Sequence, residues 1–188
     1  MATAPTVMQS SDSFKQPDYS AAAQRAIARQ PALFINNEWV RSSHAATIAV
    51  EDPSTGREIS RIVDASDADV NHAVGAARTA FDDGRWSNLP PKQRERAINK
   101  LADLIAAHAA EFAELEAIDN GKPVGMAGAI DIPGAVDMLR YMAGWASKLG
   151  GDLLEPQGVP RGKMFSYVTR EPVGVAAQIV PWNFPLLM

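Results

Sequence analysis

The sequence predicts an α/β fold, and three features of the 188-residue chain lead to that prediction. Residues 33–63 contain short runs of strand-forming residues separated by turn residues. Residues 66–150 instead place apolar side chains at helical spacing. Near the end, residues 173–180 are apolar apart from Gln178, which is typical of a strand buried on both faces of a parallel sheet.

The composition excludes several classes of function. A hydrophobic fraction of 46% with 21% charged residues is ordinary for a globular protein, and the net charge of -4 gives no basic field for nucleic acid or anionic membrane. No apolar run reaches the roughly 18 residues that a membrane-spanning helix needs. The chain has no cysteine, so it offers neither a disulfide, nor a thiolate metal site, nor a thiol nucleophile.

The first elements are expected to be small. Residues 1–30 are rich in Ser, Ala, Gln and Pro, which favours a mobile tail with a short helix near 20–29 over a targeting segment. In LFINNEWV, the pair Asn36-Asn37 tolerates positive φ and predicts a tight hairpin. Residues 47–63 predict two more strands joined by a turn at 52–56.

Four helices are expected next. Ser66 followed by Asp67 and Asp69 is typical of a capped helix start. A second helix should begin after Leu89-Pro90-Pro91, and a third should end at Asn120-Gly121. The fourth is expected to end at Gly150-Gly151, with Pro133-Gly134 marking a kink or its start. One face of it carries large side chains that we expect in the core: Met138, Met142, Trp145 and Leu149.

The stretch GKPVGMAG, residues 121–128, superficially resembles a phosphate-binding loop. The Gly-Lys pair is not followed by Ser or Thr, and no buried strand precedes it, so we predict a helix cap there.

Asn183 is the candidate for chemistry, because it follows the carboxyl end of the predicted strand, where open α/β sheets bind ligands. Its amide offers two N–H donors and stays neutral, which suits it to hold a developing oxyanion. Pro181 and Pro185 flank it and would stiffen the loop. From these residues alone, an asparagine that caps a following helix is the favoured interpretation, and the oxyanion role is the alternative.

The segment EPVGVAAQIVPWNFPLLM, residues 171–188, strongly resembles the part of NAD(P)-dependent aldehyde dehydrogenases that carries their catalytic asparagine. The blocks LFINNEWV, DPSTGREI, LADLI, DNGKP and LRYMAGWASKLGG also match that family's N-terminal half in order. The resemblance implies the N-terminal part of the aldehyde dehydrogenase fold. That part comprises small β-hairpins, helices and the first strand of a parallel dinucleotide-binding sheet, truncated just after the PWNFP motif.

In this family a cysteine attacks the aldehyde, hydride passes to NAD or NADP, and a glutamate activates water to release the carboxylic acid. The resemblance gives Asn183 the oxyanion-hole role. The cysteine and the glutamate would lie beyond Met188, so the chain is expected to be an N-terminal fragment that is inactive alone. Alternative interpretations are a non-catalytic interaction module, or a semialdehyde or acylating dehydrogenase of the same superfamily.

The resemblance also implies roles for neighbouring residues. The cofactor wall would contain Ile179, Val180, Pro181 and Trp182. The aldehyde tunnel would contain Phe184, Leu187 and Met188. Asp119 and the carbonyl near Val50 match a monovalent-cation site of some members.

The expected organisation is a tail (1–30), hairpins and helices of the cofactor-binding domain (31–163), a bridging strand (164–171), and the first dinucleotide-binding strand with its asparagine turn (172–188). The resemblance further implies a cytoplasmic homodimer or homotetramer that acts on a small aldehyde.

Overall fold

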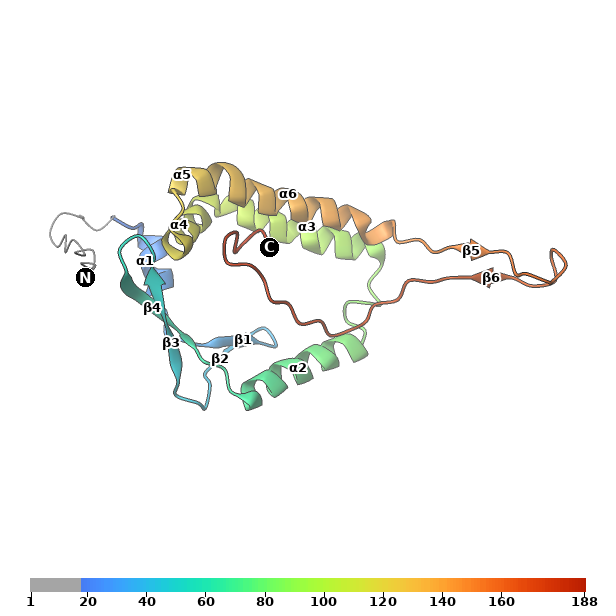
Figure 1. The fold of residues 1–188 in the computed structure, drawn as a ribbon, viewed down its shortest axis with the longest axis horizontal. Helices are drawn as coiled ribbons and strands as arrows, with labels where there is room; N and C mark the ends of the chain where they lie inside the picture. The colour runs from blue at the N-terminus through green and yellow to red at the C-terminus, as the bar shows by residue number, and fades with distance from the viewer. Residues whose placement is uncertain (1–17) are drawn as a thin grey trace, which may run out of the picture.

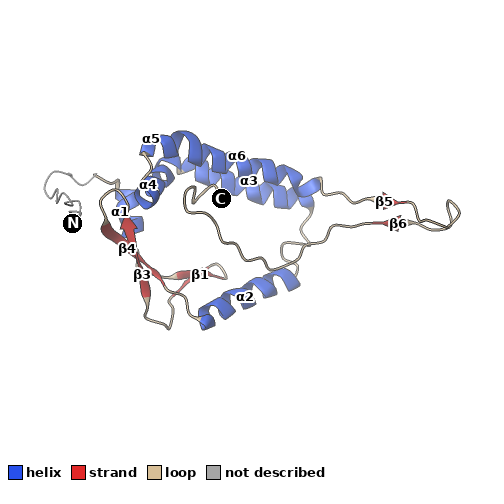
Figure 2. Cartoon of the chain, viewed as in Figure 1, coloured by secondary structure: helices blue, strands red, loops and turns tan. Residues whose placement is uncertain are grey.

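A computed structural model describes residues 18–188 of the chain, so most of the predicted tail lies outside the described residues. Helices α3 (Pro91–Ala107) and α6 (Ile132–Ala143) lie side by side, with α4 (Ala109–Asn120) and the short α5 (Val124–Met126) at one end of the pair (Figure 1). The hairpin of β3 (Thr47–Asp52) and β4 (Arg57–Val63) lies beside α1 (Ala21–Ile27) and α4. Helix α2 (Asp67–Asp82) lies apart from the helical pair (Figure 2). The α/β class is confirmed, and within residues 18–188 the strands are arranged as three antiparallel pairs.

The first hairpin forms as predicted from its asparagines. Strands β1 (Leu33–Ile35) and β2 (Glu38–Val40) pair antiparallel. Asn36 and Asn37 both adopt positive φ, 51° and 65°, which is the conformation that a two-residue hairpin turn requires.

The second hairpin is organised by Asp52. Strands β3 (Thr47–Asp52) and β4 (Arg57–Val63) pair antiparallel. The buried Asp52 carboxylate accepts hydrogen bonds from the Ser54 N–H at 2.7 Å and the Thr55 hydroxyl at 3.1 Å, and thereby shapes the turn between the strands. The short helix predicted near residues 20–29 is present as α1 (Ala21–Ile27), which is capped by Ser20. It lies near this hairpin.

Helix α2 (Asp67–Asp82) begins at the predicted capping box, in which Ser66 and Asp69 each bond the other's backbone N–H. Its predicted apolar stripe is present, but no residue of the helix is buried, and Val70 and Val74 are half-exposed. The capping signal is local and fixes the helix start, whereas burial of the stripe depends on packing partners.

The core lies between α3 (Pro91–Ala107) and α6 (Ile132–Ala143) and extends to α4 (Ala109–Asn120). Pro91 occupies the first turn of α3, where its missing N–H costs no helical hydrogen bond. The buried apolar cluster consists of Ala102, Ile105, Ala113, Ala127, Ile132 and Val136.

The segment between α4 and α6 contains an irregular helix. Gly121 ends α4 with a left-handed φ of 76°, as predicted for the Asn120-Gly121 pair. The short helix α5 (Val124–Met126) runs into a π-helical turn, Ala127–Asp131, in which the Ile132 N–H donates to the Ala127 carbonyl five residues back. This wider turn joins α6 directly, so Pro133 lies in the first turn of α6.

The predicted core position of the fourth helix's large side chains is wrong. Met138, Met142, Trp145 and Leu149 are all exposed, Met142 by 54%. Helix α6 buries its other face, which includes Ile132 and Val136, and passes into a 3₁₀ turn at Gly144–Ser147. Periodicity identified a stripe of large side chains, but the smaller residues on the opposite side pack against α3.

Two strands form an arm that projects from the helices (Figure 1). Strands β5 (Leu153–Leu154) and β6 (Ser166–Tyr167) pair antiparallel over two residues each, and the Val168 N–H adds a bond to the Asp152 carbonyl at 2.8 Å. Among residues 18–188, no helix has both the length and the apolar character needed to cross a membrane.

The predicted buried strand over 173–180 is not formed. These residues follow the arm as an extended segment without strand pairing, and Val173 is 91% exposed. A central strand is defined by ladder partners on both edges, and residues 18–188 supply none to this segment. The apolar side chains of this run are therefore largely exposed instead of buried in a sheet.

Candidate active site

The turn that carries Asn183 is held against the helices from one side. The Met188 N–H donates to the Phe184 carbonyl at 3.0 Å, which closes a helical turn at 184–188. Leu186 packs against the core cluster, and Leu187 lies beside Gly134 of α6. Phe184 is also half-buried, so the apolar residues after Asn183 anchor the turn.

Asn183 itself is exposed. Its backbone carbonyl accepts a hydrogen bond from the Lys122 ammonium at 3.2 Å. The helical turn at 184–188 follows it directly, so Asn183 also lies at the position from which a cap of that turn would act. The turn is therefore fixed through its backbone, while the amide side chain remains on the surface.

Lys122 connects this turn to two buried carboxylates. Its ammonium forms an ion pair with Asp131 and lies 4.0 Å from Glu116 Oε1. It also lies 3.9 Å from the centre of the Phe184 ring, a cation–π contact. Asp131 is 1% exposed and Glu116 4% exposed, whereas the Lys122 side chain is 18% exposed.

The two carboxylates influence each other. Burial raises the pKa of Glu116, and the neighbouring Asp131 carboxyl raises it further, while the Lys122 charge acts in the opposite direction. Glu116 Oε1 accepts no hydrogen bond within residues 18–188. Among residues 18–188, the ammonium of Lys122 is the positive charge in contact with the two acids.

Sequence reasoning did not identify these three residues. Lys122 lies in the GKPVGMAG stretch and in the DNGKP block, but neither gives it a role, and Glu116 and Asp131 carry no motif. One signal was present, because Glu116 lies three residues after the buried Ala113 and so places a carboxylate on the apolar face of α4.

The residues assigned to the cofactor wall lie on the extended segment and the start of the turn. Ile179 is fully exposed, and Val180, Pro181 and Trp182 are exposed as well. Of the residues assigned to the aldehyde tunnel, Phe184 and Leu187 are half-buried against the helices, and Met188 is exposed. The residues assigned to the cofactor wall therefore precede Asn183 and face solvent, whereas those assigned to the aldehyde tunnel follow it.

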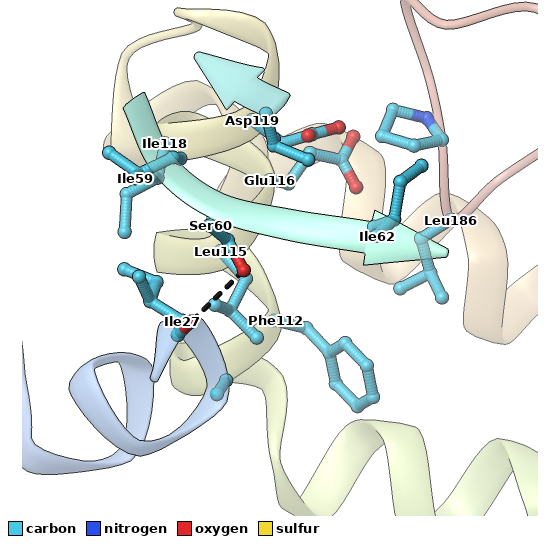
Figure 3. Close-up of a pocket in the computed structure, with 13 residues that line it drawn as sticks. Ile27, Ile59, Ser60, Ile62, Phe112, Leu115, Glu116, Ile118, Asp119 and Leu186 are labelled. Carbon is cyan, nitrogen blue, oxygen red and sulfur yellow. Dashed lines mark hydrogen bonds between the residues drawn. The ribbon is translucent and has the colours of Figure 1, made fainter. Parts of the chain in front are cut away.

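A pocket of about 440 Å³ lies behind the asparagine turn, between β4, α1 and α4 (Figure 3). Both residues assigned to the cation site, Val50 and Asp119, line it. Glu116 and Asp119 project their carboxylates into the same region from successive turns of α4, and Leu186 lies close to them. No group of three or more His, Asp or Glu side chains within residues 18–188 is arranged to hold a metal ion.

The chain is an α/β protein in which a turn with a fixed backbone presents the Asn183 amide, a hydrogen-bond donor, at the surface. Comparison with known proteins places it in a family, because the sequence model of the aldehyde dehydrogenase family matches residues 39–188. This chain belongs to the aldehyde dehydrogenase family.

Individual relatives agree. An aldehyde dehydrogenase of Alternaria alternata is 44% identical over 156 residues, which are 83% of this chain and 30% of the relative. Human mitochondrial aldehyde dehydrogenase is 42% identical over 178 residues, 90% of this chain and 34% of the relative. The NAD⁺ complex of an aldehyde dehydrogenase from Bacillus cereus superposes with a TM-score of 0.83 at 37% identity, covering 90% of this chain and 34% of that one. The chain spans about a third of the length of the relatives it matches.

Proposed function

We propose that the protein containing this chain oxidises an aldehyde to a carboxylic acid with NAD⁺ or NADP⁺, and that Asn183 is an oxyanion-hole donor in that reaction. The observation that carries the proposal is the Asn183 turn, whose backbone is bonded to Lys122 while its amide stays exposed. Family membership over residues 39–188 supports the reaction class, and the NAD⁺ complex of the Bacillus cereus relative supports the cofactor.

The proposed role follows from amide chemistry. Attack of a thiolate on an aldehyde converts the carbonyl oxygen into an oxyanion, and the thiolate would come from outside these residues, because they contain no cysteine. The Asn183 amide donates an N–H to that oxygen without any change of protonation. A donor that is aimed before the reaction needs no reorganisation, and removal of one typically lowers turnover by ~10²–10³.

The residues before Asn183 fit a dinucleotide. NAD⁺ supplies the hydride acceptor when bound. Ile179, Val180, Pro181 and Trp182 present apolar surface to solvent, so they are available to contact its rings, with Ile179 and Trp182 nearest. On the other side of Asn183, Phe184, Leu187 and Met188 would contact the apolar part of the aldehyde.

Two further assignments belong to the same proposal. A monovalent cation would bind near Asp119 and the Val50 carbonyl, and their shared position in one pocket supports this. Subunits of a cytoplasmic homodimer or homotetramer would pair through the arm. The exposure of Leu153 and Tyr167 on its two strands, and of Phe165 just before β6, supports that assignment.

The test is Asn183→Ala in the full protein that carries this chain. We expect kcat to fall by ~10²-fold while the Kd for NAD⁺ changes by less than about twofold. Asn71→Ala is the matched control, because Asn71 is exposed on α2, away from the asparagine turn, and its loss should leave kcat unchanged. Unchanged turnover of Asn183→Ala would remove Asn183 from the oxyanion role.

A further inference from the structure

The Lys122 side chain joins separate segments of the chain around the asparagine turn. It follows the Gly121 cap of α4. It forms an ion pair with Asp131 at the end of the π-helical turn, and it donates to the Asn183 carbonyl 61 residues later in the chain. The ring of Phe184 covers its ammonium at 3.9 Å.

The position of Lys122 is fixed independently of Asn183. Its backbone N–H donates to Asn120 Oδ1 at 2.8 Å, and the left-handed Gly121 sets the direction in which the chain leaves α4. An ammonium withdrawn from water needs a partner of opposite charge, and the buried Asp131 and Glu116 provide it. The lysine therefore has little freedom to leave its position when the turn moves.

The same contacts restrict Asn183. Its carbonyl is the acceptor in the bond to Lys122, and Phe184 is held by the cation–π contact, so the backbone is fixed on both sides of the Asn183 side chain. A charge-assisted hydrogen bond is shorter and stronger than a neutral one, which makes it suited to hold a loop.

We propose that Lys122 is a positioning residue that aims the Asn183 amide by holding the backbone of its turn, with Asp131 and Glu116 holding the lysine. This inference rests on the proposed oxyanion role of Asn183. Lys122 would not contact the aldehyde or the cofactor. Its whole effect on turnover should pass through Asn183, and this distinguishes it from a residue that only stabilises the fold.

The first experiment measures kcat and KM for Lys122→Met in the full protein. A small misplacement of a catalytic group can lower the rate by about 10²-fold, so we expect kcat to fall by about 10- to 100-fold, and by no more than in Asn183→Ala. KM for NAD⁺ and for the aldehyde should change by less than about twofold. Lys92→Met is the matched control, since Lys92 is an exposed lysine on α3 whose ammonium pairs with Glu95 on the same helix.

Loss of Lys122 alone leaves two buried carboxylates without a counter-charge and can prevent folding. The paired variant Lys122→Met with Asp131→Asn removes the lysine and one negative charge together, so it should fold and still lack the bond to Asn183. Lys122→Arg keeps the charge and a donor, and it should recover at least several-fold of the lost kcat. Absence of any recovery would overturn the positioning role.

The decisive measurement is a double-mutant cycle with Asn183→Ala. If Lys122 acts through Asn183, the paired Lys122 and Asp131 variant should change kcat by less than about twofold once Asn183 is alanine. If the losses multiply, or if the paired variant retains full kcat while Asn183→Ala loses it, the inference is overturned and the proposed function stands. If Asn183→Ala itself retains full kcat, it is the proposed function that fails.

Discussion

Gly121→Ala should destabilise this chain by about 1–2 kcal/mol, and two features of the structure set that magnitude. Gly121 has a φ of 76° at the end of α4, and a residue with a Cβ typically loses roughly 1–2 kcal/mol in that conformation. Alanine recovers about 0.4–1 kcal/mol of this by restricting the unfolded chain. A Cβ at this position would also lie 3.0 Å from Pro53 Cγ, closer than ordinary contact, and such crowding typically costs about 1 kcal/mol or more.

The assay is urea unfolding followed by circular dichroism. With an m-value of about 2–3 kcal/mol/M, the expected loss lowers the midpoint by roughly 0.5 M. Gly121→Asn separates the two contributions, since asparagine tolerates left-handed φ but keeps the Cβ contact with Pro53, so it should lose about half as much.

Gly75→Ala is the matched control. Gly75 lies in the interior of α2 with open space around the position of its missing Cβ, so alanine should stabilise the chain by about 0.5–1 kcal/mol. The reasoning is refuted if Gly121→Ala is as stable as the unmodified chain, or if both alanine variants lose the same amount.

Three further predictions concern stability. Ser66→Ala removes the hydroxyl of the α2 capping box and should cost about 1 kcal/mol in urea unfolding; an unchanged midpoint would mean that the cap adds nothing. Ile132→Ala leaves a cavity at a fully buried position between α3 and α6 and should lower the free energy of unfolding by about 2–5 kcal/mol. Ile130→Ala is the control, because Ile130 is half-exposed and its truncation should cost less than half as much. Burial by itself would raise the pKa of Asp52, but hydrogen bonds from Ser54, Thr55 and Tyr19 lower it overall. The stability from Asp52 is therefore present above its unfolded pKa and is lost as the pH falls below about 4, so Asp52→Asn should flatten the acid limb of a stability–pH curve. An acid limb that is equally steep in both proteins would contradict this.

Local signals in the sequence predicted the elements well. The Asn36-Asn37 turn, the Ser66 capping box and the Gly121 cap were each predicted from a few adjacent residues and are confirmed. Each depends on backbone conformation or on hydrogen bonds within a few positions, so neighbouring residues contain all the information that is needed.

Burial and long-range polar contacts were harder to predict. Met142 and Val173 are apolar and were expected inside, but burial requires a partner surface that residues 18–188 do not supply. The contact between Lys122 and Asn183 spans 61 positions and has no periodic pattern. The position of Asn183 after the apolar run made it a candidate, and the resemblance to aldehyde dehydrogenases gave it the oxyanion role. The side chains that hold its backbone became visible only in three dimensions.

The π-helical turn at Ala127–Asp131 has a consequence for how this segment can vary in length. It contains one residue more than a regular helical turn, so deletion of a single residue there would restore ordinary helical geometry rather than break the helix. Because the wider turn already takes up the extra residue, the same deletion would leave the residues before it in nearly the same rotation about the helix axis as now. Natural variation that shortens this turn by one residue should therefore be compatible with the ion pair between Lys122 and Asp131.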